Sequence, residues 1–362
     1  MRYATSLTIG EREISLESPS YFIADIGANH DGDLERAKDL IWKTKEAGSD
    51  AVKFQHFKAE KIVSDSGFRS LGGQLSHQAN WTKPVFEVYR HYELNRDWNA
   101  ALVETCEKAG IDFMTTPYDF AATEEVANLV VAMKIGSGDI SWTESISNIA
   151  SQGKPVLLAT GASTLEDVRR AVDAILEKTP QIVLMQCNTN YTGSLENFRY
   201  INLRVLESYK VHWPEMLLGL SDHTPGHATV LGAVALGARV IEKHFTDDNS
   251  REGPDHPFAM NPVTWSEMVD RTRELEAALG DGIKRIEDNE KDTAVVQRRA
   301  LYLTRDKGAG EALCAEDLEP LRPAPAGSLA PWQKAEALGR PLAVAKKAGE
   351  ALFGADLGAN HA

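Results

Sequence analysis

The sequence predicts an α/β protein in which a closed (β/α)₈ TIM barrel is followed by a small β-rich domain. Eight short apolar runs alternate with amphipathic helical patterns, which is the order expected of a closed parallel barrel. Polar side chains stand at the C-terminal end of nearly every run, where such barrels carry their active sites. The 362 residues suffice for a barrel of about 250 residues and an appendage.

The expected elements follow one another in a regular order. Residues 1–18 predict a hairpin, because Thr8-Ile9 and Ile14–Leu16 flank a Gly10-Glu11 turn. The eight predicted barrel strands are Tyr21–Ile26, Asp50–Gln55, Ile111–Thr116, Val131–Gly136, Pro155–Thr160, Gln181–Cys187, Met216–Leu220 and Arg239–Phe245. Helical patterns between and after them include Leu34–Ala47, Arg96–Ala109, Thr164–Lys178, Ala228–Leu236 and Thr264–Leu279.

Two segments depart from this regular order. The connection from His56 to Leu94 is long, and long connections of this kind are usually functional or disordered. Because it contains aromatic residues and a helical stretch at Val85–Arg90, we expect an ordered lid or a dimer contact. After the barrel domain (residues 1–280) a charged linker (281–296) leads to a second domain (297–362). The strands predicted there are Ala300–Thr304, Leu318–Arg322 and Ala343–Ala345.

Composition narrows the possible classes of function. A formal net charge of −14 argues against a protein that binds duplex nucleic acid, although local lysines can still hold anionic substrates. We expect no membrane span, because no stretch approaches the roughly 18 apolar residues required. The charged N-terminal residues do not resemble a signal peptide. Three widely spaced cysteines, Cys106, Cys187 and Cys314, favour a reducing compartment, so we expect a cytoplasmic protein.

The polar residues at the strand ends are the candidate site. They are Asp25, Lys53 and Gln55, Thr116, Lys134 with Ser137 and Asp139, Thr160, Tyr191, Ser221 with His223, and Glu242 with His244. Single members of this set have ordinary explanations, since a lysine at a strand end is commonly solvated and a lone histidine is more often structural. Two lysines on apolar strands of one barrel are harder to explain without an anion, because burying an unpaired ammonium is costly.

Several motifs, taken together and in order, resemble the sialic acid synthase family. They are Ile23-Ala-Asp-Ile-Gly-Ala-Asn-His-Asp-Gly, Val52-Lys-Phe-Gln, Lys134-Ile-Gly-Ser-Gly-Asp, Leu218-Gly-Leu-Ser-Asp-His-Thr, Ile241-Glu-Lys-His-Phe-Thr-Asp and Gly253-Pro-Asp. The C-terminal domain is similar to the antifreeze-like (SAF) domain of these enzymes. The resemblance covers essentially the whole chain, although each motif alone is weak.

The resemblance implies a transferase that condenses phosphoenolpyruvate with an open-chain N-acyl hexosamine to give a nine-carbon 2-keto sugar acid and phosphate. His223 and His244 match two metal ligands, which suit Mn²⁺ or else Mg²⁺ or Co²⁺. The positions that match the phosphoenolpyruvate site are Lys53, Thr116, Lys134, Ser137, Thr160 and Ser221. The positions on the sugar side are Gln55, Asp139, Thr189, Tyr191 and Asp255. Arg322 matches an arginine that the SAF domain inserts into the partner subunit's site, which implies a domain-swapped homodimer.

The chain departs from the family pattern at three places. Asp25 and Asp139 stand where the family usually has Glu, and Cys187–Thr192 differs from the usual Cys-Thr-Asn/Ser-x-Tyr-Pro. These differences concern the identity of the sugar more than the class of reaction. Asp25 and Glu242 are both candidates for the catalytic carboxylate, and we favour Asp25 acting through a water molecule.

Two other functions remain open at this point. One is a synthase for shorter 3-deoxy sugar acids, which uses the same phosphoenolpyruvate chemistry on a barrel. The other is a non-catalytic carbohydrate-binding paralogue. The retained set of Lys53, Lys134, His223, Glu242 and His244 argues against the second, since such a paralogue has no reason to keep metal ligands.

Overall fold

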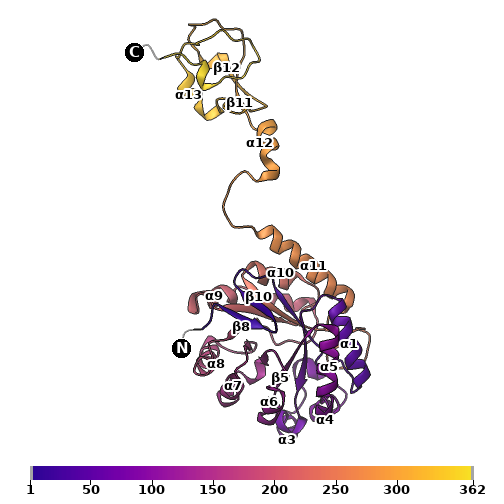
Figure 1. The fold of residues 1–362 in the computed structure, drawn as a ribbon. Helices are drawn as coiled ribbons and strands as arrows, with labels where there is room; N and C mark the ends of the chain where they lie inside the picture. The colour runs from indigo at the N-terminus through magenta and orange to yellow at the C-terminus, as the bar shows by residue number, and fades with distance from the viewer. Residues whose placement is uncertain (1–2, 360–362) are drawn as a thin grey trace. The chain divides into compact units, whose positions relative to one another are not determined.

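The computed structural model describes residues 3–359 and divides into two compact units, Met1–Gly280 and Asp281–Ala362. The first unit is a closed barrel of eight parallel strands, which confirms the predicted barrel (Figure 1). In barrel order the strands are β10 (Ala238–His244), β3 (Tyr21–Asp25), β4 (Ala51–His56), β5 (Asp112–Pro117), β6 (Met133–Ile135), β7 (Val156–Ala159), β8 (Ile182–Cys187) and β9 (Leu217–Asp222).

A helix follows each barrel strand before the next one begins. These helices are α1 (Leu34–Glu46), α5 (Asn99–Ala109), α6 (Phe120–Val126), α7 (Thr143–Ala150), α8 (Leu165–Leu176), α9 (Val205–His212), α10 (Ala228–Ala235) and α11 (Pro262–Leu279). Local signals in the sequence start several of them. The Asp33 side chain accepts hydrogen bonds from the backbone N–H groups of Glu35 and Arg36 at the start of α1, for example. No helix within residues 3–359 is long and apolar enough to cross a bilayer.

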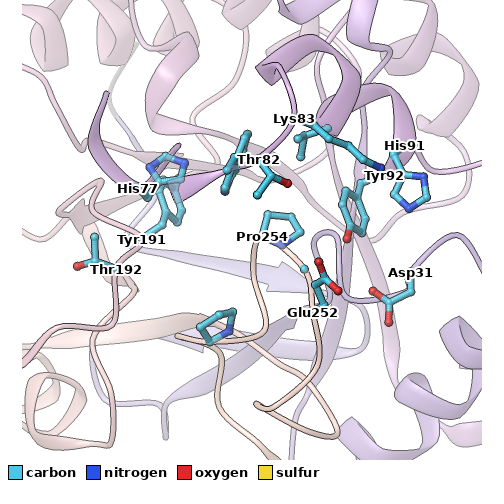
Figure 2. Close-up of a pocket in the computed structure, with 14 residues that line it drawn as sticks. Asp31, His77, Thr82, Lys83, His91, Tyr92, Tyr191, Thr192, Glu252 and Pro254 are labelled. Atoms are coloured by element: carbon cyan, nitrogen blue, oxygen red, sulfur yellow. The ribbon is translucent and has the colours of Figure 1, made fainter. Parts of the chain in front are cut away.

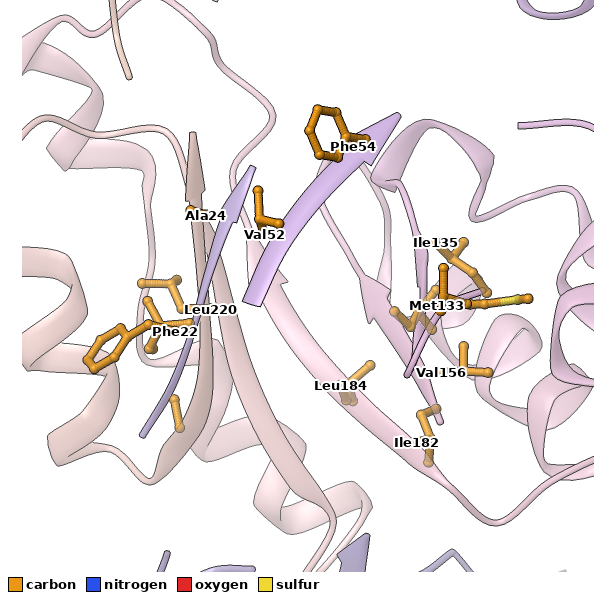
Figure 3. Close-up of a cluster of buried hydrophobic side chains, with 14 of the residues drawn as sticks. Phe22, Ala24, Val52, Phe54, Met133, Ile135, Val156, Ile182, Leu184 and Leu220 are labelled. Carbon is orange, nitrogen blue, oxygen red and sulfur yellow. The ribbon is translucent and has the colours of Figure 1, made fainter. Parts of the chain in front are cut away.

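The strands have two apolar faces because their side chains alternate in direction. Residues such as Phe22 and Val52 point outward and pack against the helices (Figure 3). Inward-facing residues such as Ile23 form a second cluster, to which the hairpin β1 (Ser6–Ile9) and β2 (Arg12–Ser15) contributes Leu7, Ile9 and Ile14. The interior is therefore filled with apolar side chains at the amino-terminal end of the strands.

The long connection between β4 and α5 is ordered, as predicted. It contains α2 (Ala59–Ile62), α3 (Asp65–Ser70) and α4 (Val85–His91). Its two ends are tied together, because the Glu93 carboxylate accepts hydrogen bonds from Lys58 Nζ at 3.0 Å and from the Ala59 backbone N–H at 2.7 Å. Val85 at the start of α4 is buried. These contacts hold α4 close to the carboxyl end of β4.

The second unit contains little regular structure. It comprises α12 (Lys291–Gln297), α13 (Lys334–Ala337) and the antiparallel pair β11 (Ala300–Leu303) and β12 (Leu318–Leu321). The predicted strand at residues 343–345 was wrong, because the chain there forms a bend flanked by single bridges at Leu342 and Lys346. Most of residues 297–359 are turns and irregular structure rather than strands.

This unit is built from one motif used twice, a repeat that the sequence analysis overlooked. Residues 307–318 (KGAGEALCAEDL) and 346–357 (KKAGEALFGADL) align without a gap. The backbones of Lys307 and Lys346 exchange two hydrogen bonds of 2.9 Å. In each copy the lysine Nζ lies 2.6 Å from an aspartate, Asp317 in the first and Asp356 in the second. The unit is therefore organised around a local twofold pseudosymmetry and two equivalent ion pairs.

Candidate active site

The inward faces of the strands change from apolar to polar at their carboxyl ends, and a cavity of about 30 Å³ lies there. The side chains that line it from the strands are Asp25, Lys53, Gln55, Thr116, Lys134, Ala159, Cys187, Ser221, Glu242 and His244. Loops that follow the strands add Tyr118, Gly136, Ser137, Tyr191 and His223. Period-two alternation along parallel strands thus brings most of the predicted residues together.

Two buried ion pairs dominate this inner cavity. Lys53 Nζ lies 2.8 Å from Asp25 Oδ2 and also donates to Thr116 Oγ1 at 3.1 Å. Lys134 Nζ lies 3.2 Å from Glu242 Oε1. Each of the four charged side chains is at most 7% exposed, so each charge depends on its partner.

Asp25 is ionised and its oxygens are occupied. Burial alone would raise the pKa of the Asp25 carboxyl, but the charges of Lys53 and His244 together with hydrogen bonds lower it to about 2. Oδ1 accepts the Gly27 backbone N–H at 3.0 Å, and Oδ2 accepts Gln55 Nε2 at 2.9 Å. Burial likewise opposes charge on Lys53, but Asp25 and Glu242 raise the pKa of its ammonium.

Glu242 differs from Asp25, because one of its oxygens is free. Oε1 accepts a hydrogen bond from Ser221 Oγ at 3.2 Å, whereas Oε2 is buried without a partner. Three other atoms in residues that line the cavities are also buried without a hydrogen-bond partner, namely Thr189 Oγ1, His244 Nδ1 and His77 Nδ1. Because unpaired buried polar atoms are costly, these are atoms for which a ligand can supply the partner.

The two predicted metal ligands face each other at the rim of the inner cavity. The ring centroids of His223 and His244 lie 5.5 Å apart. His223 Nδ1 donates to the Asn188 carbonyl at 3.1 Å, which leaves its Nε2 available. The residues just before them, Asp222 and Lys243, form a buried ion pair that links β9 to β10.

These donors fit a divalent cation that is completed by water or substrate. The fit rests on the oriented ring of His223 and on His244, whose buried Nδ1 has no hydrogen-bond partner and lies 3.6 Å from Asp255 Oδ2. Among the residues that the structure describes, no group of three or more His, Cys, Asp or Glu side chains could hold a metal.

Two glycines let the loops around the cavity pack closely against one another. The Gly161 backbone N–H donates to Ser137 Oγ at 2.9 Å, and a Cβ at this position would lie 1.9 Å from Thr189 Oγ1. Gly27 has a φ of +51°, and a Cβ there would lie 2.4 Å from Asp255 Oδ2. That carboxylate accepts the Ala28 N–H at 2.8 Å. Glycine is thus required at both positions to bring these loops together.

Two larger chambers continue outward from the inner cavity. The nearer, of about 410 Å³, is lined by Gln55, Ser137, Asp139, Thr189, Tyr191, His244 and Asp255 together with side chains of the β4–α5 connection. The outer, of about 640 Å³, includes His77, Tyr92 and Tyr191 (Figure 2). Tyr191 lines all three spaces, and its ring centroid lies 4.2 Å from that of His223.

Two predicted residues lie elsewhere. The Thr160 hydroxyl donates to the Met185 carbonyl at 2.9 Å and accepts from Tyr209 at 2.8 Å, so it is engaged away from the cavity. Arg322 belongs to the C-terminal unit, where it is exposed just after β12.

The sequence analysis also missed residues that line the cavities. Cys187, which was not among the candidate site residues, lies in the inner cavity, where contacts with His223 and Ser137 outweigh burial and lower the thiol pKa. The aromatic side chains of the β4–α5 connection and Tyr118 were also missed. The high aromatic content of that connection was the one signal that pointed to them.

The Asp25–Lys53 pair makes a prediction about stability. Asp25→Asn should destabilise the barrel by about 3–5 kcal/mol, because Lys53 keeps a buried charge without its partner. The double variant Asp25→Asn/Lys53→Met should recover part of that loss. Thermal and denaturant unfolding of the three proteins measure the effect. An Asp25→Asn barrel as stable as the parent would mean that the two side chains are not paired.

Comparisons with known proteins identify the family. Residues 40–284 match the NeuB family. The chain is 34% identical to N,N'-diacetyllegionaminic acid synthase of Legionella pneumophila over 92% of this chain and 93% of that protein. It is 33% identical to pseudaminic acid synthase of Campylobacter jejuni, over 92% and 95%. A crystal structure of N-acetylneuraminic acid synthetase from Leptospira borgpetersenii in complex with citrate has a TM-score of 0.69 at 26% identity, covering 81% of this chain and 96% of that one. The chain belongs to the NeuB family of sialic and related nonulosonic acid synthases.

Proposed function

We propose that this protein is a transferase that condenses phosphoenolpyruvate with an open-chain N-acyl hexosamine, giving a nine-carbon 2-keto sugar acid and phosphate. The observation that carries the proposal is the arrangement of the inner cavity. Two buried lysines lie there beside a carboxylate with one free oxygen, Glu242 Oε2. The cavity opens outward into a chamber large enough for a sugar.

Phosphoenolpyruvate carries a phosphate and a carboxylate, and the inner cavity offers cations and hydroxyls for both. We assign Lys53, Thr116, Lys134, Ser137 and Ser221 to this substrate. Thr160 is left out, because its hydroxyl already donates to Met185 and accepts from Tyr209. The phosphate and carboxylate of an arriving substrate would compete with Asp25 and Glu242 for the two ammonium groups. The ion pairs therefore keep the lysines charged and oriented before the substrate binds.

The reaction forms one carbon–carbon bond and breaks one carbon–oxygen bond. The enol carbon attacks the aldehyde carbon, whose oxygen gains a proton, and a cation-like carbon forms next to the phosphate oxygen. Water adds to this carbon, forming a new carbon–oxygen bond, and loses one proton to a carboxylate. The remaining hydroxyl then loses its proton and becomes the keto group as the carbon–oxygen bond to phosphate breaks. The two protons of the water end on the former aldehyde oxygen and on the departing phosphate. The negative side chains around the cavity stabilise the positive charge while it exists.

We assign the proton-accepting carboxylate to Glu242 rather than to Asp25, which the sequence analysis favoured. The Asp25 pKa of about 2 makes this carboxylate a weak base, and it accepts hydrogen bonds on both oxygens. Glu242 presents an oxygen without a partner while Lys134 and Ser221 hold the other. Asp25 then acts by positioning Lys53 and Gln55.

His223 and His244 would hold the divalent cation, with Mn²⁺ the first choice and Mg²⁺ or Co²⁺ the alternatives. When bound, the ion would supply Lewis acidity to the sugar aldehyde. The contact of His223 with the Asn188 carbonyl orients the ligand ring. The sugar itself would contact Gln55, Asp139, Thr189, Tyr191 and Asp255, which line the adjoining chamber.

We further propose that the C-terminal unit is an SAF domain that inserts Arg322 into the site of a second subunit in a domain-swapped homodimer. The exposure of Arg322 at the end of β12 supports this role. The three free cysteines support a cytoplasmic location, where thiols stay reduced.

The reaction can be tested directly with phosphoenolpyruvate, Mn²⁺ and a panel of N-acyl hexosamines. Phosphate and 2-keto sugar acid should appear in equal amounts, and both should vanish after metal chelation or with His244→Ala, because the aldehyde loses its Lewis acid. His212→Ala, an exposed histidine at the end of α9, is the matched control and should keep full activity. Phosphate release without a sugar, or full activity of chelated enzyme, would contradict the proposal.

The domain swap predicts complementation between inactive subunits. Arg322→Ala and Lys53→Ala should each lack activity, but mixed under conditions of subunit exchange they should recover roughly a quarter of wild-type activity, because half of the dimers carry one intact site. A mixture of Lys53→Ala with Glu242→Ala is the control and should stay inactive, since both lesions lie in the barrel. Equal activity of the two mixtures would exclude the swapped arginine.

A further inference from the structure

We propose that the buried Asp222–Lys243 ion pair positions the two metal-binding histidines, and that it thereby sets the affinity of the site for its divalent cation. The inference rests on the proposed function, since it takes His223 and His244 as the ligands. Neither Asp222 nor Lys243 lines any of the three cavities, so neither side chain has a part in the reaction as proposed. The pair acts through the backbone of its neighbours.

The ion pair lies on the outward face of the barrel strands, among apolar side chains. Asp222 and Lys243 are register partners on the neighbouring strands β9 and β10. The residues two positions away on the same face, Leu220, Ile241 and Phe245, belong to the apolar cluster beneath the helices. Each charged side chain is only 1% exposed. Because an apolar pair of similar volume is often at least as stable as a buried ion pair, stability alone does not account for these charges.

Lys243 holds the chain on both sides of His223. Its Nζ donates to the carboxylate of Asp222, the residue before His223. The same Nζ donates to the backbone carbonyl of Thr224, the residue after His223, at 2.6 Å. Lys243 itself directly precedes His244. One ammonium group therefore ties the backbone around the first histidine to the strand that carries the second.

Asp222 is held in turn by two threonines. Its Oδ2 accepts hydrogen bonds from Thr224 Oγ1 at 2.8 Å and from Thr229 Oγ1 at 2.7 Å, and its Oδ1 accepts the Thr224 backbone N–H at 3.3 Å. Thr229 lies in the first turn of α10, so the cluster joins two strands, the loop after β9 and a helix. All four side chains of the cluster are buried, which keeps water from competing for these contacts.

The two histidines lie at the place where this cluster matters most. Strand pairing between β9 and β10 extends to Asp222 with Lys243, one residue before His223. The contacts of Lys243 with Asp222 and Thr224 carry the alignment of the two segments past that point. They thus maintain the distance of 5.5 Å between the ring centroids of His223 and His244.

Metal affinity depends on this spacing, because one ion must contact both imidazoles and tolerates only small errors in ligand distance. The Asn188 carbonyl orients the ring of His223 but does not fix its distance from β10. Without the cluster, the segment that carries His223 can shift relative to His244. The ion would then have to draw the two ligands together, and its affinity would fall as it does when other groups that orient metal ligands are removed.

The test measures Mn²⁺ binding to metal-free protein without any turnover. The signal of free Mn²⁺ in electron paramagnetic resonance gives the dissociation constant, and thermal unfolding shows that each variant is folded. Asp222→Asn/Lys243→Met removes both charges and nearly keeps the size of each side chain. We expect its dissociation constant for Mn²⁺ to rise about 10–100-fold.

A milder variant and a matched control accompany the double variant. Thr229→Val keeps the ion pair and removes one hydrogen bond to Asp222, so the dissociation constant should rise by about threefold. The control, Arg12→Met/Asp50→Asn, removes an ion pair of 2.6 Å at the opposite, amino-terminal end of the same barrel. It should bind Mn²⁺ as the wild type does even where its thermal stability falls.

Each outcome decides the inference, and His244→Ala separates it from the proposed function. A folded Asp222→Asn/Lys243→Met protein with wild-type affinity for Mn²⁺ would overturn the inference. If that protein does not fold, wild-type affinity of Thr229→Val overturns it instead. His244→Ala should abolish Mn²⁺ binding. If it does so while the other variants bind normally, only the inference is wrong. If His244→Ala itself binds normally, the proposed metal site fails and the inference fails with it.

Discussion

The site depends on two lysine–carboxylate pairs buried at the carboxyl ends of the barrel strands. Lys53 with Asp25 and Lys134 with Glu242 place four charged side chains around a cavity of about 30 Å³. Such charges persist only when each is compensated, so the residues around them are constrained to donate, accept or exclude water. Gln55, Ser221 and the Gly27 backbone complete this compensation. Glu242 Oε2 has no hydrogen-bond partner, and this oxygen distinguishes Glu242 from Asp25.

The side chains that line the site differ between the inner cavity and the chamber outside it. The inner cavity is small and lined by charged side chains, whereas the next chamber has an aromatic wall and two carboxylates. The histidines and Tyr191 lie at the junction, where the two substrates must meet. The strands position the inner groups rigidly, and the β4–α5 connection supplies the wall. The charged groups and the aromatic wall are therefore supplied by different parts of the fold.

The barrel and the inner cavity were predictable because both follow from period-two alternation on parallel strands. That rule places Lys53, Lys134 and Glu242 inward at the strand ends without knowledge of tertiary contacts. It could not predict the surroundings of Thr160, because the Thr160 hydroxyl accepts a hydrogen bond from Tyr209 of α9, which is distant in the sequence. The aromatic wall was missed for the same reason, since the path of a long connection depends on packing rather than on local pattern. The repeat in the C-terminal unit was visible in the sequence and simply overlooked.

The central claim is that Glu242 provides the free carboxylate oxygen that the reaction needs. Steady-state kinetics of Glu242→Gln test it most directly, because the amide can keep the contacts of Oε1 with Lys134 and Ser221 while losing the basic oxygen. The account predicts a kcat lower by roughly 10²–10⁴, with the KM for phosphoenolpyruvate changed little. A Glu242→Gln enzyme that turns over near the wild-type rate would contradict it and return the role to Asp25.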